Sequence, residues 1–126
     1  MINYGTGIDI VENRQMKDAV RKFGSSFLNR VFHPNEITRA KNKPEDYRGY
    51  AVKFAAKEAF LKAMGTGWRK GISWKEIEVE TRRGRDIEIK LHGKTLQTAG
   101  KLGVGRIFGS FSYSGDYSLS QVIVER

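Results

Sequence analysis

Glu58 and Lys62 are the two side chains of this sequence best placed to form a functional site. They are four positions apart in the segment YAVKFAAKEAFLKAMGTG, residues 50–67, where strong helix formers run up to Gly65 and predict one helix. At about 100° per residue, both charges fall in a narrow stripe between two apolar surfaces, so the helix is predicted to be mostly buried. They indicate either a functional site or an ordinary i,i+4 ion pair, worth roughly 0.2 to 0.5 kcal/mol. The two apolar surfaces consist of Val52, Ala55, Ala56, Ala59 and Ala63 on one side and Phe54 and Leu61 on the other.

Asp9 is a second carboxylate that could take part in chemistry. Apolar and polar residues alternate over residues 3–11 and predict a strand, with Ile8 and Ile10 on its apolar face and Asp9 on the other face. A carboxylate at the end of a strand, just before a helix, can be a metal ligand or can help to cap the following turn. The residues alone leave both interpretations open.

Basic residues gather on a predicted helix over residues 13–23, which Gly24 ends. Arg14, Lys17 and Arg21 recur at helical spacing and form a basic stripe, which either docks on an acidic helix or is a solvated face. The side of this helix that is predicted to enter the core carries Met16, Ala19, Val20 and Phe23. A second basic stretch, GTGWRKG at residues 65–71, could approach phosphate, although it follows a helix, unlike the glycine loops of dinucleotide and P-loop sites.

Length and composition limit the classes of protein that this chain can belong to. Its 126 residues predict a single domain, residues 1–126, and the absence of cysteine excludes disulfides and thiolate chemistry. No segment has the pattern of a signal peptide or the length of a membrane span, which predicts a cytoplasmic protein without membrane attachment. The net charge of +9 favours a polyanionic partner, namely nucleic acid, a phosphorylated small molecule or an acidic protein.

The remaining segments predict an α+β fold, with an antiparallel sheet packed against the long central helix. Short helices are predicted after Ser25 and from Pro34, and a loop through Asn42, Lys43 and Pro44 leads to the central helix. His33 has no metal-ligand partner at helical spacing and is interpreted as structural. Apolar and charged residues alternate in residues 77–81 and 87–91, on either side of the turn RRGR, which predicts a hairpin. A helix is predicted over residues 94–102, and two final strands are predicted over residues 106–113 and 118–124.

Four segments together resemble the holo-[acyl-carrier-protein] synthase family of small phosphopantetheinyl transferases. They are GIDIVEN at residues 7–13, FLNRVFHPNE at 27–36, KFAAKEAFLKAMGTG at 53–67 and SFSYSGDYS at 110–118, so the likeness runs in order through nearly the whole chain. It implies the 4′-phosphopantetheinyl transferase-like fold. It also implies transfer of 4′-phosphopantetheine from coenzyme A to a serine of apo acyl carrier protein, with release of adenosine 3′,5′-bisphosphate.

The resemblance assigns roles to the residues that were left open above. Asp9 and Glu58 match the Mg²⁺ ligands of the family and Lys62 matches a lysine that faces the coenzyme A phosphates, so these three are the expected catalytic residues. Mg²⁺ commonly uses one or two carboxylates and fills its other positions with water and phosphate oxygens, which agrees with this set. The proton acceptor for the carrier serine is either Glu58 or a water on the metal.

Further positions match the coenzyme A pocket and the carrier-docking surface of the family. The expected coenzyme A-binding residues, besides Lys62, are Arg48, Lys53, Gly65, Gly67, Tyr113 and Ser114. The stripe of Arg14, Lys17 and Arg21 would receive the acidic recognition helix of the carrier protein. Family members are typically homotrimers with each site at a subunit interface.

This chain departs from the family pattern most clearly at Tyr113. The family has S-x-S-H-[ST] before the last turn, where the histidine contacts substrate phosphate, whereas this chain has tyrosine between Ser112 and Ser114. A tyrosine offers one neutral donor from a longer side chain. A carrier-binding protein that has lost catalysis through this change is therefore one alternative to the enzyme. A second is a basic nucleic-acid-binding module, which rests on the net charge of +9 and on scattered Trp68, Trp74 and Tyr113 but lacks a recognised base-reading motif.

Overall fold

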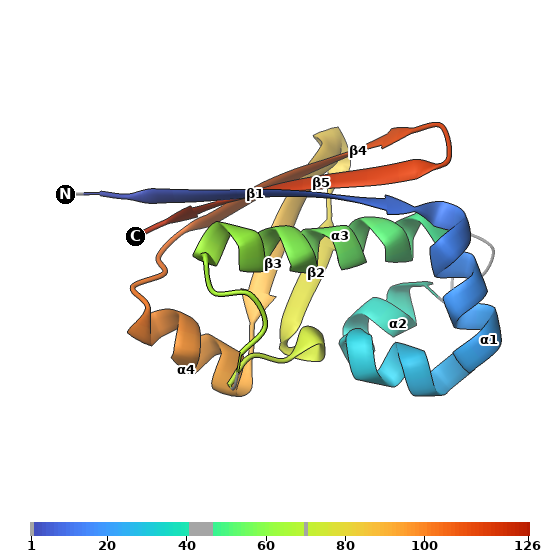
Figure 1. Cartoon of the computed structure of the whole chain (residues 1–126), viewed down its shortest axis with the longest axis horizontal. Coiled ribbons are helices and arrows are strands. Elements are labelled where there is room, and N and C mark those ends of the chain that lie inside the picture. Colours follow the sequence, from blue (N-terminus) through green and yellow to red (C-terminus); the bar gives the residue numbers. More distant parts are fainter. Residues whose placement is uncertain (1, 41–46, 70) are drawn as a thin grey trace.

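The computed structural model describes residues 2–40, 47–69 and 71–126, which form a five-stranded antiparallel sheet crossed on one face by a long helix (Figure 1). The strands lie in the order β1-β5-β4-β3-β2, so the first strand is an edge strand beside the last. This is the predicted α+β fold. The strands are β1 (Tyr4–Glu12), β2 (Ile77–Thr81), β3 (Asp86–Leu91), β4 (Ile107–Ser114) and β5 (Tyr117–Glu125).

The sheet has two parts that meet between β3 and β4. β5 pairs along its whole length with β1 on one side and with β4 on the other, whereas β3 pairs with β4 only at Asp86↔Ser110 and Ile87↔Gly109. The β2–β3 hairpin consequently turns away steeply from the other three strands (Figure 1). The hairpin turn is η2 (Arg83–Arg85), the predicted RRGR turn, in which Gly84 and Arg85 have positive φ.

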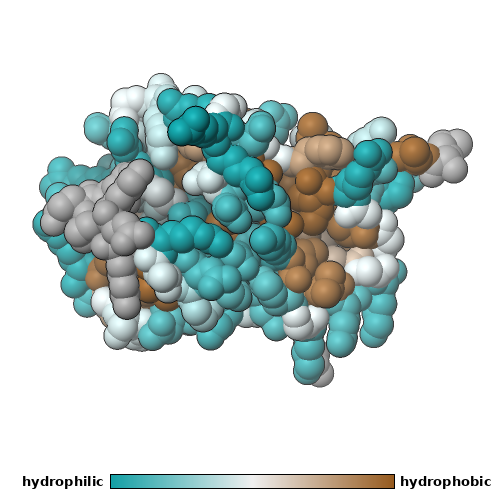
Figure 2. Space-filling view, turned by 180° about the vertical axis from the view of Figure 1, so that it is seen from behind, coloured by the Kyte–Doolittle hydropathy of each residue, from teal (hydrophilic) through white to brown (hydrophobic). Residues whose placement is uncertain are grey.

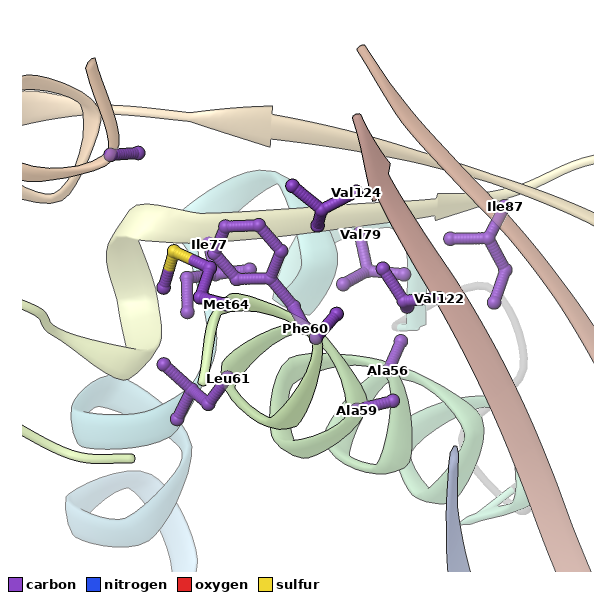
Figure 3. Close-up of a cluster of buried hydrophobic side chains, with 12 residues drawn as sticks. Ala56, Ala59, Phe60, Leu61, Met64, Ile77, Val79, Ile87, Val122 and Val124 are labelled. Carbon is purple, nitrogen blue, oxygen red and sulfur yellow. The ribbon is translucent and has the colours of Figure 1, made fainter. Parts of the chain in front are cut away.

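Helix α3 (Tyr47–Met64) lies at the centre of the molecule and is mostly buried, as predicted, although it begins before the predicted start. Figure 3 shows Phe60 and Ala56 of α3 pointing toward Val122 and Val124 of β5 and Val79 of β2. Gly65 ends the helix with φ 77°, a left-handed conformation that glycine adopts at little cost.

The small residues of α3 allow β1 to approach the helix backbone. A Cβ atom at Gly5 would lie 1.9 Å from the carbonyl oxygen of Ala63, and one at Gly7 would lie 2.0 Å from that of Ala59. Only glycine fits at these two positions. This contact fixes the side of β1 that faces the helix, and Asp9 is the next residue on that side.

The remaining helices pack around the ends of α3 (Figure 1). Helix α1 (Asn13–Val31) is broken at Gly24, where φ is 56°, so it consists of the two predicted helices. Helix α2 (Pro34–Ala40) begins at the predicted proline and α4 (Gly93–Lys101) lies within one residue of its prediction. The predicted loop at Asn42, Lys43 and Pro44 lies outside the described residues, as does Lys70 in the basic loop.

One prediction about the core is wrong. Phe23 is exposed, because it lies at the last turn before the break at Gly24, and Lys22 stacks over its ring. Ile8 and Ile10, on the predicted apolar face of β1, are also 57% and 55% exposed, because the close approach of α3 leaves room only for Gly5 and Gly7 on the inner face and turns the isoleucines outward.

The surface carries most of the chain's charge. The face in Figure 2 is largely hydrophilic, and its apolar residues gather in the half where β1 begins. Within the described residues, no helix has both the length and the apolar character that crossing a bilayer requires.

Candidate functional site

The structure brings Asp9, Glu58 and Lys62 together where β1 lies against α3. Lys62 reaches across from the helix and its Nζ donates hydrogen bonds to Asp9 Oδ1 at 2.9 Å and to the carbonyl oxygen of Ile8 at 3.0 Å. The side chain of Lys62 is 54% exposed, so this ion pair is screened by water and adds little to stability. The cluster is therefore open to solvent and accessible to a ligand.

The two carboxylates of this cluster repel one another. Burial raises the pKa of Glu58 above its usual value, and the charge of Asp9 raises it further, while a hydrogen bond from Trp68 and the charge of Lys62 oppose the shift. A raised pKa means that Glu58 carries its negative charge at an energetic cost. A divalent cation between the two carboxylates would remove this cost.

The donor atoms of this cluster fit Mg²⁺. Both side chains offer carboxylate oxygens, the ligand type that this hard ion prefers, and Mg²⁺ fills its remaining positions from water or substrate. The charge of Asp9 acts on Glu58, so both carboxylates are close enough to interact. Asp9 and Glu58 are thus the residues here that could hold the ion.

A strongly basic pocket of about 430 Å³ lies between α2, α3, β4 and the β2–β3 turn. None of the described residues that line it is acidic, and Lys53 at its wall is buried. A site of this kind is suited to phosphate groups, because guanidinium groups bind phosphate oxygens in pairs. The cationic lining residues are Arg39, Lys53, Arg82, Arg83 and Arg85.

Tyr113 is part of the wall of this basic pocket. The guanidinium carbons of Arg48 and Arg85 lie 4.8 Å and 5.1 Å from the centre of its ring, and Phe111 packs edge-on at 5.8 Å. The ring therefore lies within cation–π distance of two guanidinium groups, at the pocket that Lys53 also lines. Ser114 lies on the opposite, exposed face of β4, away from this pocket.

The carboxylate cluster and the basic pocket lie on different sides of α3. Lys53 and Glu58 are five positions apart, which at about 100° per residue separates them by about 140° around the helix. Lys53 faces the β2–β3 turn, whereas Glu58 faces β1 and the loop that contains Trp68. Gly65 and Gly67 lie beyond the far end of α3, both with positive φ. The sequence-predicted coenzyme A residues are therefore divided between two places.

Helix α1 lies beside the carboxylate cluster. A shallow, largely apolar pocket of about 290 Å³ separates them, with Asp9 at one edge and Met16, Phe27 and Phe54 among its lining residues. Arg14 and Arg21 of the basic stripe are exposed, and Lys17 is half-buried. A partner that docks on α1 would thus reach the carboxylates.

Sequence reasoning missed several residues that shape these sites. Arg39 was assigned only to a short helix, and Arg82, Arg83 and Arg85 only to a turn. Three arginines in one hairpin turn are a signal for an anion site. Trp74 was also missed. It stacks between Phe54 and Trp68, with ring centroids 4.8 Å and 3.9 Å away, and so supports the residue that donates to Glu58.

Comparison with known proteins gives a consistent result over nearly the whole chain. A family model described as the 4′-phosphopantetheinyl transferase superfamily matches residues 5–122. A holo-[acyl-carrier-protein] synthase of Geobacter sulfurreducens is 41% identical over 123 residues, which cover 98% of each chain.

Solved structures give the same picture. The crystal structure of a holo-[acyl-carrier-protein] synthase from Neisseria meningitidis superposes with a TM-score of 0.87 at 30% identity and covers 97% of this chain and 98% of its own. A synthase from Helicobacter pylori, crystallised in complex with coenzyme A, superposes with a TM-score of 0.80 at 27% identity and covers 94% of this chain and 98% of its own.

Proposed function

The chain belongs to the 4′-phosphopantetheinyl transferase superfamily and is an enzyme of the holo-[acyl-carrier-protein] synthase type, and from this premise we propose its reaction and site. It transfers 4′-phosphopantetheine from coenzyme A to a serine of apo acyl carrier protein and depends on Mg²⁺. Adenosine 3′,5′-bisphosphate leaves. The observation that carries the proposal is the meeting of Asp9, Glu58 and Lys62 between β1 and α3.

Asp9 and Glu58 hold the metal in this proposal. When bound, Mg²⁺ supplies neutralising charge to the pyrophosphate of coenzyme A. Lys62 is exposed and flexible enough to leave Asp9 for a phosphate oxygen, which stabilises the departing group. The serine proton passes to Glu58 or to solvent. Trp68 donates a hydrogen bond to Glu58 and so limits the orientations of its carboxylate.

The nucleotide end of coenzyme A binds in the basic pocket. Lys53 and Arg48 supply charge, and the hydroxyl of Tyr113 donates to a phosphate oxygen in place of the family histidine. Support comes from the position of the Tyr113 ring between Arg48 and Arg85, which would offer a phosphate both cations and a neutral donor. Gly65 and Gly67 let the backbone approach the substrate near Lys62.

We further propose that the enzyme is a homotrimer and that one coenzyme A spans two copies of the chain. The carboxylates and the basic pocket of a single chain lie on different sides of α3, so in one chain alone they would contact different molecules of coenzyme A. An apolar outer sheet face supports self-association: Ile8, Ile10, Phe108 and Ile123 are all exposed there. We propose a cytoplasmic enzyme, as the sequence predicts.

The carrier protein docks on α1. Arg14 and Arg21 attract its acidic helix, and the apolar pocket beside Asp9 accepts one of its apolar side chains. The acceptor serine is thereby brought to the carboxylate cluster. Lys17 contributes charge at the edge of this surface.

The test is to incubate the protein with coenzyme A, Mg²⁺ and an apo carrier protein and to weigh the carrier by mass spectrometry. A mass increase of one phosphopantetheine group is expected, together with its loss on chelation. Asp9→Asn should abolish most of the transfer, since it removes one of two charged ligands, while Asp86→Asn, at an exposed position of β3 outside the carboxylate cluster and α1, serves as the matched control. Full transfer by Asp9→Asn would refute the metal assignment. Binding of the carrier without transfer would mean that catalysis has been lost.

A further inference from the structure

Both histidines of the chain lie in one place, although they are far apart in the sequence. His33 stands at the start of α2 and His92 just before α4, and their rings stack with centroids 4.6 Å apart and 25° between their planes. Between them is Glu78 of β2, whose side chain is only 3% exposed. Its Oε1 lies 2.9 Å from His92 Nε2 and 3.8 Å from His33 Nδ1.

The second oxygen of Glu78 is already occupied. Oε2 accepts hydrogen bonds from Arg39 at 2.6 Å and from Asn35 Nδ2 at 3.3 Å. These bonds fix the carboxylate so that Oε1 faces the two imidazoles. Burial acts to raise the pKa of Glu78, but the hydrogen bonds from Arg39, His92 and Asn35 outweigh it and bring the pKa to about 2. The carboxylate is therefore ionised before any ligand arrives.

We propose that His33, Glu78 and His92 form a second metal site, separate from Asp9 and Glu58, that binds Zn²⁺. One ligand atom from each of the three residues lies within 4.8 Å of the others. Two imidazoles and one carboxylate are a ligand set that Zn²⁺ uses, with a fourth position for water. Ligand atoms at about 2.0 to 2.1 Å from a tetrahedral ion are about 3.3 Å from one another. The two stacked rings would therefore have to turn out of their stack to point both nitrogens at one ion.

The protons of the cluster are compatible with this site. His33 Nδ1 accepts the backbone N–H of Asn35 at 3.0 Å, so it already offers a lone pair. When it turns to the metal, the exposed N–H of Asn35 is left to water. His92 Nε2 and Glu78 Oε1 lie at hydrogen-bond distance, 2.9 Å, and a bound Zn²⁺ would take the place of the proton between them.

The surroundings set the selectivity and the strength of the site. Mg²⁺ prefers an all-oxygen set, so it selects the carboxylates Asp9 and Glu58, whereas imidazole nitrogen selects Zn²⁺. Arg39 holds Glu78 as an outer partner but also offsets its charge, so micromolar affinity is expected. A bound ion would tie α2, β2 and the start of α4 together, next to the basic pocket that Arg39 also lines.

The site is tested by adding zinc chloride to tag-free, metal-free protein and following the imidazole nitrogens by long-range ¹H–¹⁵N NMR. Because the chain has only two histidines, every imidazole signal comes from this cluster. One equivalent of Zn²⁺ should shift both rings together and raise the melting temperature. Isothermal titration should give one site, weakened at least about tenfold by His92→Gln or His33→Gln, both of which replace partly exposed side chains.

Asp9→Asn separates this site from the proposed magnesium site. Zinc binding that survives unchanged in Asp9→Asn and is weakened at least about tenfold in both histidine variants supports the proposal. Unmoved imidazole signals, absence of zinc uptake, or binding that is lost only in Asp9→Asn would each overturn it. Calcium chloride and magnesium chloride at the same concentration should leave both imidazoles unchanged.

Discussion

Replacing Lys57 by methionine should destabilise the protein strongly, because Lys57 is a fully buried cation whose donors are all used within the chain. Its Nζ donates to Glu36 Oε1 at 2.8 Å, to the carbonyl oxygen of Trp74 at 2.9 Å and to that of Ile77 at 2.7 Å. Both side chains of the ion pair have 0% exposure. Burial lowers the pKa of Lys57, while the charge of Glu36 acts in the opposite direction.

The size of the effect follows from what the substitution leaves behind. Lys57→Met keeps the length of the side chain but leaves the carboxylate of Glu36 buried without a countercharge. Breaking a buried pair in this way costs about 3 to 5 kcal/mol, a large share of the roughly 5 to 15 kcal/mol that stabilises a domain. Glu36 Oε1 and Oε2 accept the backbone N–H groups of His33 and Val79, and glutamine can accept only one of them, so Glu36→Gln alone carries a cost. In the Lys57→Met background the same change also removes an uncompensated buried charge, so adding it there should cost much less than it does alone.

The assay is urea unfolding at neutral pH, followed by circular dichroism, of the wild type, both single variants and the double variant. Lys101→Met, on the exposed last turn of α4, is the matched control and should change the free energy of unfolding by less than about 0.5 kcal/mol. A loss below about 1 kcal/mol in Lys57→Met, or strict additivity in the double variant, would refute the reasoning.

Three further predictions concern the site itself. Glu58→Gln should abolish turnover yet raise the stability of the fold at neutral pH. Because folding raises the pKa of this carboxyl above its usual 4.5, the folded protein loses stability as pH rises above that value, and glutamine removes the loss. Equal unfolding midpoints of the variant and the wild type at pH 7 would contradict this prediction. Replacing Arg14 and Arg21 by glutamate should raise the KM for the carrier protein and leave coenzyme A binding nearly constant. Equal effects on both substrates in steady-state kinetics would mean that the basic stripe has a structural role and does not dock the carrier. Tyr113→Phe keeps the ring but deletes its donor, so calorimetry should show coenzyme A binding weakened by about 1 to 3 kcal/mol, and unchanged affinity would mean that the hydroxyl does not touch the substrate.

Local patterns predicted the elements of this fold but not the side of β1 that faces inward. The α3 helix, the two hairpins and the break at Gly24 follow from helix formers, alternation and glycine, all of which act over a few residues. Alternation placed Ile8 and Ile10 on one face of the strand and Asp9 on the other, but it did not say which face meets the helix. The apolar face lies outward because Gly5 and Gly7 meet the backbone of α3, a contact between segments far apart in the chain.

The same limit applies to the clusters of polar residues. His33 had no ligand partner at helical spacing, yet Glu78 and His92 reach it from β2 and from the start of α4. The four arginines of the basic pocket that sequence reasoning missed likewise come from α2 and the β2–β3 turn. Each residue type was visible in the sequence, but only tertiary contacts define which charges share one site.

Lys57 and Glu58 show how the structure separates a structural charge from one that is available to a substrate. They are adjacent on a largely apolar helix, so composition and spacing treat them alike. About 100° of helix rotation turns Lys57 toward α2 and β2, where three oxygens satisfy its three donors. Glu58 instead faces Asp9, a like charge, and its carboxylate keeps free capacity to accept a cation. Because a bound cation lowers the energy of Glu58 but could only disturb Lys57, the physical demand for a ligand lies at the glutamate.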